Sequence, residues 1–139
     1  MARKYAYWIS TALLCLLYLA SVTMYLTMGE KVHQSIVALG YPAYLRQILI
    51  VVKVLGVVAI LSRRSVALSD LAYAGMFFHL LLALSAHVHA GDGGFAPALV
   101  GLIALTVSFY TQNAARKKQS PYMSTSVRRS PTEQATVNR

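Results

Sequence analysis

Charged residues are scarce in this chain of 139 residues, and acidic residues are the scarcest of them. Only 12% of the residues are charged, about half of the fraction usual in a soluble domain, and just four are Asp or Glu. Cysteine occurs once, at Cys15, which excludes an internal disulfide, a Cys-x-x-Cys redox centre and a cysteine-based zinc site. A glycine-rich phosphate loop, the His-Glu-x-x-His zinc motif and a nucleophile elbow are also missing. The chain therefore contains none of the common catalytic motifs from which an enzyme activity could be assigned.

Long apolar segments are what the chain has in abundance. Hydrophobic residues account for 57% of the sequence, and they come in continuous blocks rather than at amphipathic spacing. These blocks predict four membrane-spanning helices, at about residues 7–26, 45–61, 68–90 and 95–110. Arg3 and Lys4 resemble the start of a signal peptide. However, the first apolar run is longer than usual and no Ala-x-Ala cleavage site follows it, so an uncleaved helix is predicted.

The connection at residues 27–44 is the longest between the predicted spans. Its apolar residues indicate a short amphipathic helix at the membrane interface that ends at Gly40; they are Val32, Ile36, Val37 and Leu39. The expected fold class is therefore all-α: an integral membrane four-helix bundle with a short amphipathic helix between the first two spans. Residues 1–112 are predicted to form this membrane domain.

Positive residues favour one end of the predicted bundle. Seven flank the spans on the side of the termini and two lie on the other side: Arg3, Lys4, Arg63, Arg64, Arg116, Lys117 and Lys118 against Lys31 and Arg46. By the positive-inside rule both termini are predicted to be cytoplasmic. Membrane topology thus accounts for the net charge of +9, and nucleic acid is not an expected partner because no binding motif is present. Residues 113–139 are predicted to be a basic, disordered cytoplasmic tail.

One charged residue lies deep in a predicted span, and it marks the candidate site. At the centre of a bilayer the charge of Lys53 costs about 2.5–3.5 kcal/mol on insertion scales, so it is tolerated only beside protein or water. His79 lies near mid-depth in the third span, on a face of small residues. The short connection makes the second and third spans antiparallel neighbours, which brings Lys53 and His79 to similar depth. Tyr18 completes a predicted interior pocket. It belongs to a polar stripe of the first span with Thr11, Ser21 and Tyr25.

The chemistry of this pocket stays open on the sequence alone. No carboxylate lies deep in any span, so Lys53 has no evident counter-ion. The lysine could lose its proton, donate to backbone carbonyls, extend toward the outer interface, or hold an anion or a ligand carbonyl such as that of a quinone. His79 could form a hydrogen bond between helices instead of binding a ligand. His87 lies near the outer surface with His89 and Asp92, and no metal site is predicted there because the two histidines point about 160° apart on a helix.

A pattern of residues in this chain resembles the DoxX-like family of small four-helix membrane proteins. It extends over about residues 5–112, and its most specific part is LGYPAYLRQILIVVKVLGVVAIL at residues 39–61. The family has a similar Leu-Gly-Tyr-Pro-x-Tyr sequence, then a lysine and a Leu-Gly pair. Residues 71–92, LAYAGMFFHLLLALSAHVHAGD, are similar to the family's Ala-Tyr-Ala-Gly stretch and to its histidine shortly before Gly-Asp. By this resemblance Lys53 and His87 match the family's lysine and histidine.

Two positions depart from the family pattern. His79 stands where the family is expected to have Asp, so the expected Lys–Asp pair is absent, and Ala86 stands where Ser commonly precedes the histidine. These changes argue against an activity that needs an ionised carboxylate in the pocket. The resemblance implies a bacterial inner (plasma) membrane location. It also implies an association with quinone-linked redox work, through the thiosulfate:quinone oxidoreductase subunit that gives the family its name.

Three functions are consistent with these residues. The favoured prediction is a non-catalytic accessory or assembly component without a cofactor, acting with a protein partner in the membrane or as a homo-oligomer. The alternative is a quinone- or lipid-binding subunit of a membrane redox system. A small-solute or proton-coupled transporter is a further alternative, and it would need an oligomer. No residue is predicted to be catalytic, and the ligand-binding candidates are Lys53, His79, Tyr18 and His87.

Overall fold

The computed structural model describes residues 1–122, and in that range it is entirely helical, without strands. The α-helices are α1 (Ala2–Thr27), α2 (Gly29–Ala38), α3 (Leu45–Ser62), α4 (Val66–Ala90) and α5 (Ala96–Thr111), followed by the 3-10 helix η1 (Gln112–Ala114). The predicted all-α fold class is confirmed, and the helices begin and end within a few residues of the predicted boundaries.

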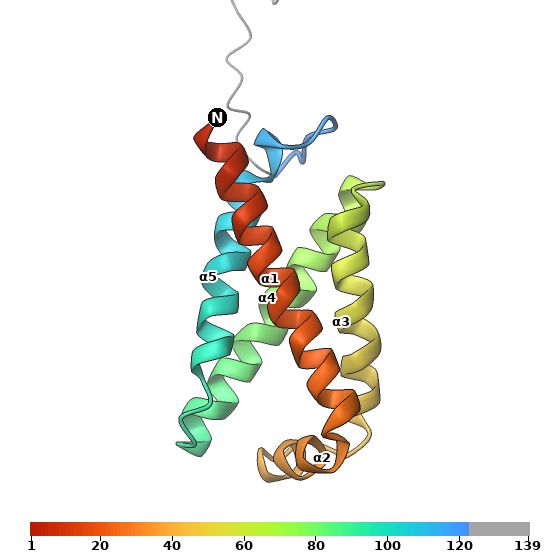
Figure 1. Cartoon of the computed structure of the whole chain (residues 1–139), viewed down its shortest axis with the longest axis vertical. Coiled ribbons are helices and arrows are strands. Elements are labelled where there is room, and N and C mark those ends of the chain that lie inside the picture. Colours follow the sequence, from red (N-terminus) through yellow and green to blue (C-terminus); the bar gives the residue numbers. More distant parts are fainter. Residues whose placement is uncertain (123–139) are drawn as a thin grey trace, which may run out of the picture.

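The four long helices alternate in direction along the chain. Figure 1 shows α1 crossing α4, with α3 on one side and α5 on the other. In this arrangement α1 packs against α3 and α5, and α4 packs against the same two helices. The N-terminus lies at one end of the bundle, and α2 lies across the opposite end. Below, proximal means toward the N-terminal end of the bundle and distal means toward α2.

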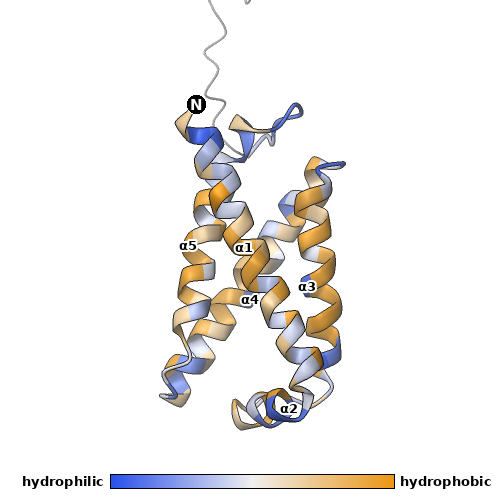
Figure 2. Cartoon of the chain, viewed as in Figure 1, coloured by the Kyte–Doolittle hydropathy of each residue, from blue (hydrophilic) through white to orange (hydrophobic). Residues whose placement is uncertain are grey.

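Three helices, α1, α3 and α4, are long and apolar enough to cross a membrane. Their outward faces carry large apolar side chains, among them Leu16, Val58, Phe78 and Leu82, which are 55–65% exposed in the isolated chain. Hydrophilic residues gather at the two ends of the bundle (Figure 2). An exposed apolar surface of this extent is typical of contact with lipid, so the chain is an integral, multi-pass membrane protein.

The fourth predicted span corresponds to α5, which is apolar but has only 16 residues. At 1.5 Å per residue this helix is about 24 Å long, shorter than a hydrocarbon core of about 30 Å. It packs along α1 and α4, and its residue Gly101 permits a close approach, since a Cβ there would lie 2.9 Å from Leu80 Cδ2.

The predicted amphipathic helix is α2. Its buried residues are Val32 and Ile36, whereas Val37 is half exposed. The helix ends at Ala38, and Gly40, the predicted stop, follows its cap residue with φ +84°. The Gly40 N–H donates to Val37 and the Tyr41 N–H donates to Ile36, at 2.9 and 3.0 Å, which is the Schellman arrangement that favours glycine at this position.

Residues 113–122, the first part of the predicted tail, make contacts with the bundle. Asn113 and Ser120 are buried, and the Ser120 N–H donates to Asn113 Oδ1 at 2.8 Å. The Ser120 hydroxyl donates to Asp70 Oδ2 at 2.7 Å, and Gln112 Nε2 donates to Asp70 Oδ1 at 3.3 Å. Side-chain hydrogen bonds to α4 therefore order this segment, which composition alone did not indicate. The remainder of the predicted tail, residues 123–139, lies outside the described residues.

Arg63 connects three segments of the chain at the proximal end of the bundle. It ends α3 in the left-handed region, with φ 52°, and its guanidinium donates to the carbonyl of Ala115. The same guanidinium lies 5.4 Å from the ring centroid of Trp8 and 5.9 Å from that of Tyr7. One side chain thus connects the α3–α4 turn with α1 and with the segment after α5.

Three buried hydroxyl groups connect α1, α4 and α5 inside the proximal half. Ser108 Oγ lies 2.6 Å from Thr11 Oγ1 and 2.6 Å from the Tyr73 hydroxyl oxygen. All three residues are at most 2% exposed. They adjoin an apolar core in which Leu14, Ile60 and Leu105 take part. Since water cannot replace these partners in an apolar interior, the hydroxyl network holds the three helices in register.

Candidate functional site

Two cavities meet midway along the bundle, at the residues that the sequence singled out. The proximal cavity, of about 420 Å³, lies between α3 and α4 and has aliphatic walls, for example Leu55, Ala59, Leu68 and Ala72. The distal cavity, of about 490 Å³, is lined by α1, α4 and the start of α5 and contains Ser21, Tyr25 and His87. Three residues line both cavities: Tyr18, Lys53 and His79. The predicted interior cluster is therefore present, and it separates an apolar cavity from a more polar one.

Lys53 contributes the ammonium group of this cluster. Its side chain is only 4% exposed, and Nζ donates to Ser21 Oγ at 2.6 Å. Nζ also lies 3.9 Å from the ring centroid of Tyr25, a cation–π contact. Ser21 and Tyr25 are one turn apart on α1, so the same face of that helix supplies both contacts. The sequence left open how the Lys53 ammonium group is accommodated. In the structure it donates a hydrogen bond to a neighbouring helix, and the acceptor is a hydroxyl rather than a backbone carbonyl.

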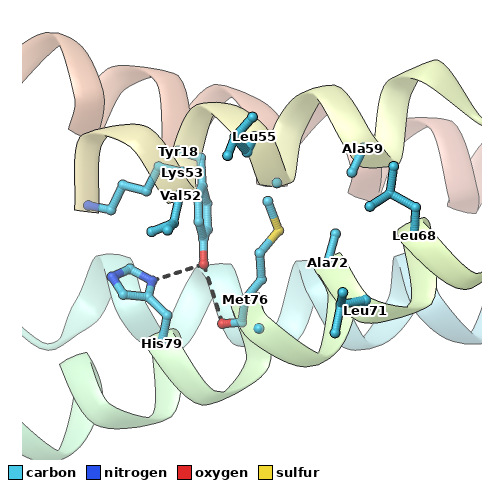
Figure 3. A pocket seen from close by; sticks show the side chains of 12 residues that line it. Tyr18, Val52, Lys53, Leu55, Ala59, Leu68, Leu71, Ala72, Met76 and His79 are labelled. Atoms are coloured by element: carbon cyan, nitrogen blue, oxygen red, sulfur yellow. Dashed lines mark hydrogen bonds between the residues drawn. The ribbon is translucent and has the colours of Figure 1, made fainter. Parts of the chain in front are cut away.

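Tyr18 and His79 form the second half of the cluster. The Tyr18 hydroxyl lies 3.0 Å from His79 Nδ1 and 3.3 Å from the carbonyl oxygen of Met76, as Figure 3 shows. Because a hydroxyl has one proton, both contacts are satisfied when His79 Nδ1–H donates to the tyrosine oxygen and the tyrosine donates to Met76. In that tautomer Nε2 of His79 is an acceptor. The cluster can then provide a ligand with hydrogen-bond donors, from the Lys53 ammonium group, and with one acceptor, Nε2 of the His79 imidazole.

His87 lies at the distal end of the same cavity, beside the turn that follows α4. Its Nδ1–H donates to the Asp92 carboxylate, with oxygens at 2.7 and 2.9 Å, and the Gly94 N–H donates to Asp92 Oδ1 at 2.8 Å. Gly91 ends the helix with φ 63° and makes this turn possible. Hydrogen bonds from Gly94 and then His87 hold the pKa of Asp92 below its ordinary value of 3.8.

The Asp92 contact should therefore persist throughout the neutral and mildly acidic range. A carboxylate with a lowered pKa in the folded state contributes stability above its unfolded pKa and loses it only as the pH falls through the folded pKa. We expect a carbon-13 NMR titration of the Asp92 carboxyl to give a midpoint below 3.8. In His87→Ala the midpoint should rise only in part, because the Gly94 N–H is the larger cause. A midpoint of 3.8 or above in the unaltered protein would contradict this geometry.

The donor set suits an organic ligand better than a metal. Within residues 1–122 there is no group of three or more His, Cys, Asp or Glu side chains that could hold a metal ion. The cluster instead presents an ammonium, a hydroxyl and an imidazole to two cavities with largely apolar walls. Such a surface can hold the hydrogen-bonding head of a molecule whose remaining surface is apolar.

Comparison with known proteins agrees with the architecture. The sequence model of the DoxX-like family matches residues 9–109, which extend from the first third of α1 to nearly the end of α5. The chain belongs to the DoxX-like family. No curated protein and no solved structure matched the chain. In this DoxX-like chain the matched segment contains both cavities and the whole Tyr18, Lys53 and His79 cluster.

Sequence reasoning placed the principal residues of the DoxX-like site but not their partners. All four ligand-binding candidates line the distal cavity: Tyr18, Lys53, His79 and His87. Ser21 and Tyr25 were recognised as part of a polar stripe, but not as the residues that contact Lys53. Their spacing of four residues on one helix face was the available signal. Thr11, from the same stripe, bonds to Ser108 in the proximal half and does not line either cavity.

Proposed function

We propose that this DoxX-like protein is a non-catalytic membrane component that holds an amphipathic ligand inside its bundle. The polar head of the ligand accepts hydrogen bonds from Lys53 midway along the helices, and its apolar part occupies the proximal cavity. His79 and Tyr18 complete the binding surface for the head, and His87 lines the distal end.

The position of Lys53 is the observation that carries this proposal. An ammonium group has three donors, whereas within the described residues Lys53 has one hydrogen bond, to Ser21, and the ring contact with Tyr25. An enclosed charge with donors to spare is costly in an apolar region and favours a ligand that supplies acceptor oxygens. The cavities on both sides of Lys53 provide the room for such a ligand.

The wall chemistry supports a ligand with two different ends. Apart from the three shared residues, the described residues that line the proximal cavity are aliphatic side chains, Met76 and two glycines. Hydroxyl and imidazole groups occur instead in the distal cavity, at Ser21, Tyr25 and His87. An isoprenoid quinone, or another lipid with a carbonyl or phosphate group, has one polar end and one apolar end that match these two cavities. The redox role of a quinone-binding subunit is the alternative within this ligand class.

The placement in the membrane is part of the same proposal. We propose that α5 crosses the bilayer beside α1, so that residues 1–112 form a four-span domain with both termini in the bacterial cytoplasm. The excess of Lys and Arg near the proximal end supports this orientation by the positive-inside rule. A short span is accommodated by local thinning of the bilayer or by flanking side chains that extend to the interface.

Native mass spectrometry of the detergent-purified protein tests the proposal. Solvent extraction and lipid identification would follow, with Lys53→Met prepared in parallel. We expect one amphipathic compound at about one per chain in the unaltered protein, and its loss from Lys53→Met. Protein without any bound compound in both preparations would contradict ligand binding and direct the search to a protein partner.

A further inference from the structure

We propose that the proximal and distal cavities form a single path, along which the head group of an amphipathic lipid moves from one half of the bilayer to the other. The lipid head is uncharged or anionic. This inference rests on the proposed function, because Lys53, Tyr18 and His79 would hold the head midway. It goes beyond that function, because a binding component need not release its ligand on the opposite side.

The extent of the two cavities along the bundle is the first argument. On α4 the lining residues begin at Leu68, near the proximal end, and continue to His87, near the distal end. At 1.5 Å per residue this stretch is about 28 Å long, close to the hydrocarbon thickness of about 30 Å. The helix α1 lines the distal cavity as far as Tyr25 and reaches the proximal cavity only at Tyr18, whereas α3 lines the proximal cavity as far as Ala59 and reaches the distal cavity only at Lys53. The cavities thus follow one another along α4 and adjoin at the residues that they share.

The nature of the barrier is the second argument. Among the described residues, the two cavities share the side chains of Tyr18, Lys53 and His79. Tyr18 is held by contacts of 3.0 Å to His79 and 3.3 Å to Met76, and Lys53 is held by one hydrogen bond to Ser21 and by its contact with the Tyr25 ring. A head group that accepts hydrogen bonds can replace these contacts one at a time. Rotation of side chains, rather than separation of helices, would then open the path.

Charge decides which head groups can pass. Among residues 1–122 no carboxylate lines either cavity, and the basic residues that line them are Lys53, His79 and His87. Lys53 faces the midpoint that any head group must cross. A cationic head would meet a like charge in an apolar region, whereas an anionic or carbonyl head would gain a charge-assisted hydrogen bond.

Vesicles with a fluorescent lipid can measure this movement. The full chain is reconstituted into phosphatidylcholine vesicles with a trace of phosphatidylglycerol carrying a nitrobenzoxadiazole label on its acyl chain, and external dithionite bleaches the labelled lipid that reaches the outer leaflet. Gly75→Leu narrows the proximal cavity, because a Cβ at Gly75 meets no atom within 4 Å and the side chain enters open space. Ala74→Leu adds a leucine to the neighbouring exposed position, outside both cavities. Trapped soluble dye reports leakage.

The path predicts that the unaltered protein and Ala74→Leu bleach the inner-leaflet label at least tenfold faster than empty vesicles do. Gly75→Leu and Lys53→Met should return to the rate of empty vesicles, and a labelled lipid with an amine head should not be accelerated. Equal rates in Gly75→Leu and Ala74→Leu would overturn the path. So would a protein that retains its Lys53-dependent bound lipid but does not accelerate bleaching, and in that case the proposed binding function would stand.

Discussion

Lys53→Met should lower the occupancy of the co-purified ligand by about 10- to 100-fold while leaving the thermal stability of the bundle unchanged or raised. A hydrogen bond to a charged group contributes about 1.5–3 kcal/mol, and each 1.4 kcal/mol changes a binding constant tenfold. The substitution keeps a side chain of similar length in the cavity. It removes a charge that the protein encloses at 4% exposure and that has no carboxylate partner within residues 1–122. Ser21 can then donate to a carbonyl of its own helix, so little is left unsatisfied.

The matched control for this prediction is Lys31→Met, which makes the same chemical change at an exposed position on α2. Ligand occupancy by native mass spectrometry and melting by intrinsic fluorescence should both be unchanged in the control. If Lys53→Met retained full occupancy, or if it lost occupancy only together with the fold, the ammonium group would not be the ligand-binding group.

Ser108→Ala should destabilise the bundle by about 1–3 kcal/mol, the cost of leaving buried hydroxyl groups without their partner. Ser108 is the shared partner of Thr11 and Tyr73, and all three residues are almost fully buried. Tyr73→Phe should cost less, since the bond between Thr11 and Ser108 remains. Single hydrogen bonds between membrane helices contribute about 0.6 kcal/mol on average and up to about 1.7 kcal/mol, and Ser108 makes two of them. Reversible unfolding in mixed detergent and dodecyl sulfate micelles measures the difference.

Thr106→Val serves as the control in the same helix. The Thr106 hydroxyl donates to the carbonyl of Leu102 at 2.8 Å within α5 and connects no second helix. Its removal should change the free energy of unfolding by less than about 0.5 kcal/mol, as is usual for exposed positions. Equal effects of Thr106→Val and Ser108→Ala would show that the hydroxyl network does not hold α1, α4 and α5 together.

The helices were predictable because an apolar run of this length has few alternatives to forming a membrane-spanning helix. Lys53 was predictable as a candidate for the same reason, since a single charge inside such a run is conspicuous. The position of Gly40 at the end of α2 also followed from local chemistry, because its φ of +84° is one that glycine adopts without strain.

Partners between helices were not predictable, because they depend on the rotation of each helix about its axis. The polar stripe of α1 contains Thr11 and Ser21, and nothing in its spacing indicates that Thr11 bonds to α5 while Ser21 bonds to α3. The contacts of the segment after α5 were not predictable for a similar reason. Its Ser and Asn residues are typical of disorder by composition, yet Ser120 and Asn113 pair with each other, and Ser120 also bonds to Asp70 on α4.

Photo-cross-linking tests the central claim, that an amphipathic ligand binds where the two cavities meet. The probe is a long-chain amphiphile with a diazirine next to its carbonyl head, added to the full chain in lipid vesicles, and mass spectrometry locates the labelled residues. The account predicts saturable labelling among Tyr18, Ser21, Lys53 and His79, lost in Lys53→Met and retained in Lys31→Met. Labelling confined to outward-facing residues such as Phe78, and equal in both variants, would contradict it.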